Sequence, residues 1–145
     1  MDRRELFAGS AAAGVVLASG AAVAAQHGED QKKHYMPPHK EFRAQAQVCL
    51  GDGHACLDHC LALLGRGDTS MAACAKIVKQ MNAVCAAIGP VASTGSRHVK
   101  SIAKLCLEVC TDCKAECDKH AKKHMLCKVC SESCAEMIKI AKTIA

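Results

Sequence analysis

The twelve cysteines of this 145-residue chain are spaced so that they can lie on the buried faces of helices. In the stretch CLEVCTDCKAEC, from Cys106 to Cys117, successive cysteines are four, three and four residues apart. Steps of three and four place side chains on one stripe of an α-helix. The twelve are Cys49, Cys56, Cys60, Cys74, Cys85, Cys106, Cys110, Cys113, Cys117, Cys127, Cys130 and Cys134. Each fits such a stripe together with apolar neighbours, which predicts amphipathic helices with thiols on the core side.

Start and stop signals divide the chain after residue 37 into four helices. The expected helices run from Pro38 to about Leu64, from Asp68 to about Ile88, from Ser96 or Arg97 to a turn near Lys119–Lys123, and from there to about Thr143. Pro is tolerated in a first turn, and Asp68 is a good N-cap. GRGD ends the first helix, Gly89-Pro90 ends the second, and VASTGS is a loop. Four amphipathic helices with short connections predict an all-α, up-down antiparallel four-helix bundle with a Cys-lined core.

Two glycines, Gly51 and Gly53, lie inside the first expected helix. Each weakens a helix by about 1 kcal/mol relative to Ala. They either permit a close approach of the backbone to the core or mark a kink, and the sequence leaves both interpretations open.

The N-terminus has the pattern of an export signal. Arg3-Arg4 precede an apolar, Ala-rich run, and AVA at 22–24 offers a small-residue cleavage site. This predicts a signal peptide of the twin-arginine type over residues 1–25, with an uncleaved membrane anchor as the alternative. Residues 26–37 are expected to form a flexible His/Met tail, and 38–145 the bundle. The expected location is the periplasm, and no later segment is judged apolar enough to span a bilayer.

Composition argues against several functions. The formal net charge is +5, but Lys and Arg are scattered among Asp and Glu, which is typical of solvated helix faces. A nucleic-acid surface would need a basic stripe with stacking aromatics, and Trp is absent. No nucleophile with its base is recognisable, so an enzyme is not expected. Neither a nucleic acid nor, after signal cleavage, a membrane is an expected partner.

Several chemistries use clustered cysteines. An even cysteine count in an exported protein suggests disulfides, but cysteines four apart on one helix are poorly oriented for a bridge. Zinc usually takes two C-x2-C pairs or Cys/His mixtures, and iron–sulfur clusters use loops such as C-x2-C-x2-C. Cu(I) prefers thiolate and thioether ligands, and it accepts two or three. A C-x3-C pair such as Cys113/Cys117 is then a nearly complete site, so the spacing favours Cu(I), with interhelical disulfides still open.

Charge balance also favours a monovalent ion. Twelve buried thiolates would be very costly without compensation, whereas neutral thiols pack as small hydrophobes. Each Cu(I) that binds displaces a proton, so the core stays near neutral up to about one ion per cysteine. Divalent ions at that ratio would accumulate positive charge.

The chain resembles the bacterial copper storage proteins. The resemblance covers nearly its whole length and includes the twin-arginine leader, the His/Met tail, CLGDGHACLDHC, SMAAC, CLEVCTDCKAEC and CKVCSESC. It implies a four-helix bundle that holds many Cu(I) ions, which enter at one end through His and Met residues. His59 and Met71 match the positions at that end. Leu63 stands where exported members would carry a further Met.

The helix order independently indicates the same end, which we call the mouth: the end where the first and third helices finish and the second and fourth begin. It gathers His59, Met71, His120, His124 and Met125. The candidate ligands there are His59, Met71, His120 and Met125, in addition to the twelve cysteines. Met81 and Met137 are interpreted as core packing. The opposite end carries an apolar plug of Phe42, Ile88, Val99, Ile102, Ile138 and Ile140.

The sequence therefore predicts a protein that stores Cu(I) and supplies it to a copper-requiring enzyme or copper chaperone, as a monomer or a homo-oligomer. The alternative is a disulfide-rich structural or redox protein of the periplasm.

Overall fold

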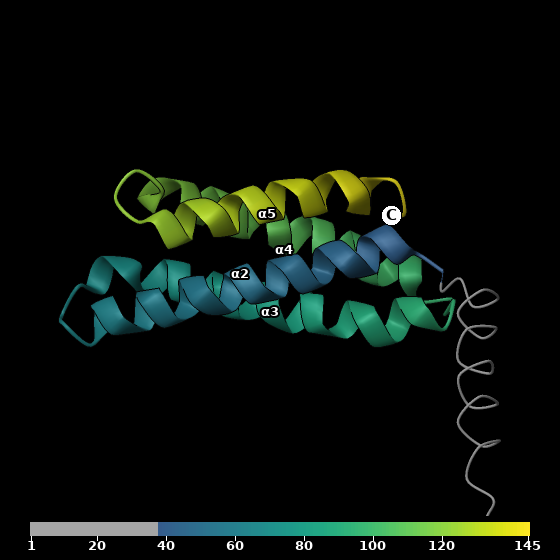
Figure 1. Ribbon diagram of the computed structural model, residues 1–145, viewed down its shortest axis with the longest axis horizontal. Coiled ribbons are helices and arrows are strands. Elements are labelled where there is room, and N and C mark those ends of the chain that lie inside the picture. The colour runs from purple at the N-terminus through teal and green to yellow at the C-terminus, as the bar shows by residue number, and fades with distance from the viewer. Residues whose placement is uncertain (1–37) are drawn as a thin grey trace, which may run out of the picture. The chain divides into compact units, whose positions relative to one another are not determined.

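A computed structural model describes residues 38–145, which form four α-helices and one short 3-10 turn. They are α2 (Lys40–Leu64), η1 (Thr69–Met71), α3 (Ala72–Ser93), α4 (Val99–His120) and α5 (Met125–Lys142). No strand occurs within this range. The helices alternate in direction (Figure 1). Each packs against two others: α2 and α4 each contact both α3 and α5. The predicted up-down antiparallel four-helix bundle is confirmed. The proposed signal peptide and tail lie outside the described residues.

The connection from α2 to α3 follows the signals in the sequence. Gly65 caps α2, and Gly67 takes a left-handed φ of 89°, a conformation that glycine adopts without strain. The Asp68 carboxylate accepts a hydrogen bond from the Ser70 backbone N–H at 3.1 Å. Asp68 thus caps η1, and α3 follows directly. The turn between α4 and α5 spans Ala121–His124, close to the predicted position.

The predicted end of the second helix is wrong. Instead of ending at Gly89-Pro90, α3 continues to Ser93 with Pro90 inside it. Proline disfavours a helical conformation in the preceding residue by clashing with its Cβ, and Gly89 has none. Ala92, in the added turn, is fully buried, so continuing the helix also buries apolar surface. The left-handed Gly95, with a φ of 61°, follows the end of the helix.

The stretch that contains η1 and α3 is unusually apolar. One described stretch, Thr69–Ser93, is long and apolar enough to span a bilayer by length and composition, with a mean hydropathy of 1.2. The expectation that no segment after the leader would reach this level is therefore wrong. The apolar character comes in large part from residues such as Cys74, Val78 and Met81, which are fully buried in the bundle.

The core changes character along the bundle. At the end away from the mouth, Phe42, Ile88 and Val99 are buried. Ile102, Ile138 and Ile140 are partly buried and pack against the core. Between this apolar end and the mouth, cysteines supply most of the buried side chains. The bundle thus has an apolar plug, a sulfur-lined interior and a mouth.

Gly53 marks a close approach between α2 and α3. A Cβ atom at this position would lie 2.0 Å from Oδ1 of Asn82 and 2.6 Å from Cε of Met81. At Gly51, by contrast, an added Cβ would meet nothing within 4 Å. Of the two interpretations of these glycines, close approach applies to Gly53.

Candidate metal centre

All twelve cysteines are buried as free thiols. Each side chain is at most 1% exposed. They come from all four helices, and α4 contributes a complete stripe from Cys106 to Cys117. The prediction that the helical stripes bury every thiol in the bundle core is therefore confirmed.

The sulfur atoms form four groups in which every Sγ lies within 4.8 Å of the others. The groups are Cys56/Cys60/Cys74/Cys127, Cys56/Cys117/Cys130, Cys113/Cys130/Cys134 and Cys85/Cys106/Cys110. Cys56 belongs to the first and second groups, and Cys130 to the second and third. The first three groups are thus linked through shared sulfurs into one continuous column.

Sulfur contacts between helices connect this column. Cys56 Sγ lies 3.8 Å from Cys127 Sγ, and Cys74 Sγ lies 3.7 Å from Cys117 Sγ. In the fourth group, which shares no cysteine with the column, Cys106 Sγ and Cys110 Sγ of α4 are 3.7 Å apart. A disulfide would bring two sulfurs to about 2.05 Å. These distances are those of neighbouring thiols, and one metal ion can bridge them, because metal–sulfur bonds are about 2.3 Å long.

Cys49 lies outside the four groups but is fixed at their inner end. Its thiol donates a hydrogen bond to the Ser133 carbonyl oxygen at 3.1 Å. The Gln45 side-chain amide donates to the same oxygen, also at 3.1 Å. These bonds tie the α2 thiol to the α5 backbone, so Cys49 is positioned by polar contacts as well as by packing.

Burial and neighbouring thiols shift the pKa values of the core cysteines in different directions. Burial raises the pKa of Cys60 to about 12, which keeps this thiol protonated at neutral pH. A hydrogen bond from Cys110 lowers the pKa of Cys106 to about 5. The same interaction raises the pKa of Cys110. A core of this kind holds most of its protons until a metal ion displaces them.

At the mouth, two histidines contact each other directly. His59 Nε2 lies 2.9 Å from His124 Nδ1, and the ring centroids are 4.9 Å apart. The His120 ring is 6.4 Å from that of His124. All three histidines are partly exposed, whereas Met71 is fully buried. His59 directly precedes Cys60, and His124 lies three residues before Cys127, so both histidines are at the level of the first cysteine group.

The structure separates the four predicted mouth ligands. His59 and His120 lie with His124, a residue that the helix order places at the mouth but that is not among the predicted ligands. Its step of four from His120 and of three to Cys127 was the signal that could have identified it. His120 Nε2 is buried without a hydrogen-bond partner, 3.8 Å from Glu116 Oε1.

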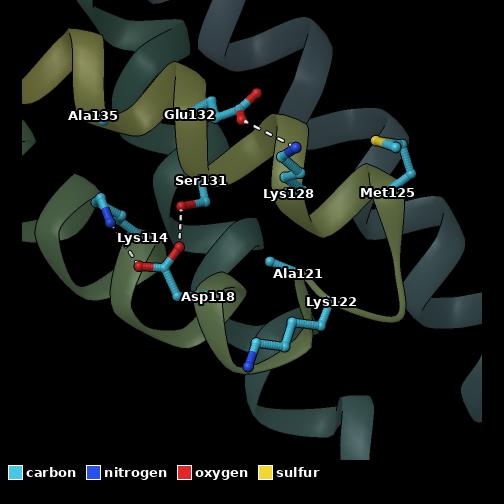
Figure 2. Close-up of a pocket in the computed structure, with 9 residues that line it drawn as sticks. All are labelled: Lys114, Asp118, Ala121, Lys122, Met125, Lys128, Ser131, Glu132 and Ala135. Carbon is cyan, nitrogen blue, oxygen red and sulfur yellow. Dashed lines mark hydrogen bonds and ion pairs between the residues drawn. The ribbon is translucent and has the colours of Figure 1, made fainter.

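Met125 lies elsewhere, in a surface pocket between α4 and α5 (Figure 2). Its side chain is 67% exposed. Lysines surround this pocket, and two of them pair with carboxylates: Lys114 with Asp118 at 2.6 Å, and Lys128 with Glu132 at 3.8 Å. The structure therefore does not bring Met125 together with the histidine cluster.

Comparisons with known proteins agree with this geometry. The family model described as copper storage protein matches residues 15–144. The solved structure of Cu(I)-bound copper storage protein BsCsp3 superposes with a TM-score of 0.65 at 22% sequence identity, covering 73% of this chain and 96% of that one. The uncharacterised cysteine-rich protein YhjQ of Bacillus subtilis (strain 168) is 28% identical over 95 residues, which is 62% of this chain and 85% of that protein.

Proposed function

The chain belongs to the copper storage protein family, and on that premise we propose that it holds many Cu(I) ions on its core cysteines and supplies them to a copper-requiring enzyme or copper chaperone. The observation that carries the proposal is the column of overlapping sulfur groups, each within 4.8 Å. Isolated structural sites would need separate sets of four ligands. Shared sulfurs such as Cys56 and Cys130 instead suit ions that bridge from one group to the next.

The chemistry of the donors supports Cu(I). Thiolates are soft ligands, and Cu(I) is satisfied by two or three of them. Every ion that binds displaces a proton from a buried thiol, so the core remains near neutral as it fills. The expected capacity is on the order of one ion per cysteine. A neutral core closed to solvent also keeps the bound metal from reacting, which is consistent with storage rather than catalysis.

Copper enters, in this proposal, at the mouth. His59 directly precedes Cys60, and Met71 and His124 lie three residues before Cys74 and Cys127, all three cysteines being members of the first group. Neutral imidazole and thioether hold Cu(I) less tightly than paired thiolates, which suits residues that pass an ion inward. At the other end, Phe42, Ile88 and Val99 present no donor atoms.

The place of storage is proposed to be the periplasm. The pair Arg3-Arg4 and the Ala-rich run that follows support export by the twin-arginine route. That route carries folded proteins, so the thiols would be buried in a reducing compartment before export. The recipient would then be an exported copper enzyme or a chaperone that serves one.

Titration of Cu(I) into the reduced protein, against a competing chelator, tests the proposal. We expect saturation at about ten or more ions per chain. Cys113→Ala with Cys117→Ala should lower this capacity by roughly two ions, since each thiol accounts for about one. Saturation at three or four ions, or a preference for Zn(II), would overturn storage.

Thiol titration of the denatured apo-protein tests the disulfide alternative, because a low number of free thiols would support disulfides.

A further inference from the structure

Met81 places a sulfur atom beside the cysteine groups. It lies on the buried stripe of α3, one turn before Cys85, and its side chain is fully buried. The thiol of Cys85 donates a hydrogen bond to Met81 Sδ at 3.5 Å. Cys85 in turn belongs to the innermost group, with Cys106 and Cys110.

Met81 occupies a level of the core where two helices lack cysteine. On α3, Cys74 and Cys85 are three turns apart, roughly 16 Å along the axis. On α2, the facing residue is Gly53, which lies between Cys49 and Cys56. The Met81 methyl group occupies the space that a side chain at position 53 would need, since it lies 2.6 Å from the Cβ position. Of these two helices, α3 therefore supplies the sulfur at this level, through Met81.

Resting on the proposed function, we infer that Met81 is a thioether ligand for Cu(I), with Cys85 as its thiolate partner. Metal–sulfur bonds of about 2.3 Å let one ion join sulfurs up to about 4.6 Å apart, and the 3.5 Å separation is within that span. Cys106 or Cys110 supplies the third sulfur of a trigonal site. A thioether is soft and carries no charge, so the site forms without adding a buried anion.

The chain contains a matched control for this inference. Met137, on α5, is also fully buried. Among the described residues it receives no hydrogen bond from a cysteine, in contrast to Met81. Replacement of Met by Leu nearly conserves volume and is well tolerated in protein cores. Met81→Leu and Met137→Leu therefore remove one sulfur each while both keep the packing.

X-ray absorption at the selenium edge of selenomethionine-labelled, Cu(I)-loaded protein tests the inference. Because the signal is averaged over all selenomethionines, we expect a copper shell around selenium in the wild type, a clearly weaker shell in Met81→Leu, and no weakening in Met137→Leu. Changes in the outer sphere already weaken metal sites roughly 10- to 100-fold. Loss of a direct ligand should thus let a chelator withdraw one ion at least about tenfold more readily from Met81→Leu.

The possible outcomes separate the inference from the proposed function. Equal selenium spectra and equal chelator withdrawal in the two variants would mean that Met81 only packs, while a full wild-type load would leave storage standing. A wild type that binds only a few ions would overturn storage itself before any variant is compared. Circular dichroism of both variants checks that each remains folded.

Discussion

Position 53 has no room for a side chain larger than the hydrogen atom of glycine, because Asn82 lies against it. A methyl group at position 53 would overlap with Asn82 Oδ1 at 2.0 Å. Asn82 is only 6% exposed, and the Met81 methyl also lies 2.6 Å from the added Cβ, so both buried side chains would have to shift within a packed core. Gly53→Ala should therefore destabilise the apo-protein by about 1–3 kcal/mol, the usual cost of overpacking a core.

Gly51 provides the control for that variant. It lies in the same helix but is exposed, with open space around it. Gly51→Ala should stabilise the protein by about 0.5–1 kcal/mol, since Ala has the better helix propensity. Denaturant unfolding of the reduced apo-proteins measures both changes. Two shifts of the same sign would contradict the close approach of α2 and α3.

The mouth residues should govern rates rather than capacity. His59 and Met71 lie one and three residues before Cys60 and Cys74 of the first cysteine group, and neither supplies a thiolate to it. We expect His59→Ala with Met71→Leu to slow Cu(I) uptake and removal several-fold and to leave the final load unchanged. Leu at position 71 keeps the buried volume. Stopped-flow transfer to and from a coloured chelator gives these rates, with the exposed His54→Ala as control. Unchanged rates would place the route of copper elsewhere.

Among the elements, the helical stripes were predictable and one helix end was not. Twelve cysteines in steps of three and four fix which face of each helix is buried, because no other arrangement hides all of them. The end of α3 depended on a local competition between Pro90 and the burial of Ala92, and proline signals alone gave the wrong result. Boundaries of this kind are decided by tertiary packing, which a single sequence does not display.

In the candidate site, too, some residues could be placed from the sequence and others could not. Periodicity was sufficient to place the cysteines in the core, since burial follows from the stripe. It was insufficient for Met125 and His124, which lie next to each other at the start of α5 and point to different surroundings. His124 is the N-cap of α5 and has an extended backbone, with φ −129° and ψ 103°, whereas Met125 is the first helical residue, so their side chains leave the backbone in different directions. For Met81, the sequence predicts only core packing, because the 3.5 Å distance from its Sδ to Cys85 Sγ depends on side-chain conformation.

For the whole molecule, the neutral core predicts that folding does not require metal. Buried thiols pack as small hydrophobic groups, and Phe42, Ile88 and Met137 complete the interior. Circular dichroism of the reduced, metal-free protein should show nearly the full helical content of the loaded form. Copper should then raise the thermal midpoint, because a ligand bound only by the native state stabilises it. A coil that becomes helical only with copper would contradict this.

A bundle plugged at one end has a consequence for the order in which ions leave. If all copper ions enter and leave through the mouth, the ions bound last are released first. The copper bound deepest in the bundle is then the copper that was bound earliest. Protein half-filled with one stable copper isotope and topped up with the other should release the second isotope first when a chelator is added. Mass spectrometry of successive extracts measures that order. Extracts of constant isotope ratio would mean that ions exchange along the column or leave by another route. The order of release would then be independent of the order of binding.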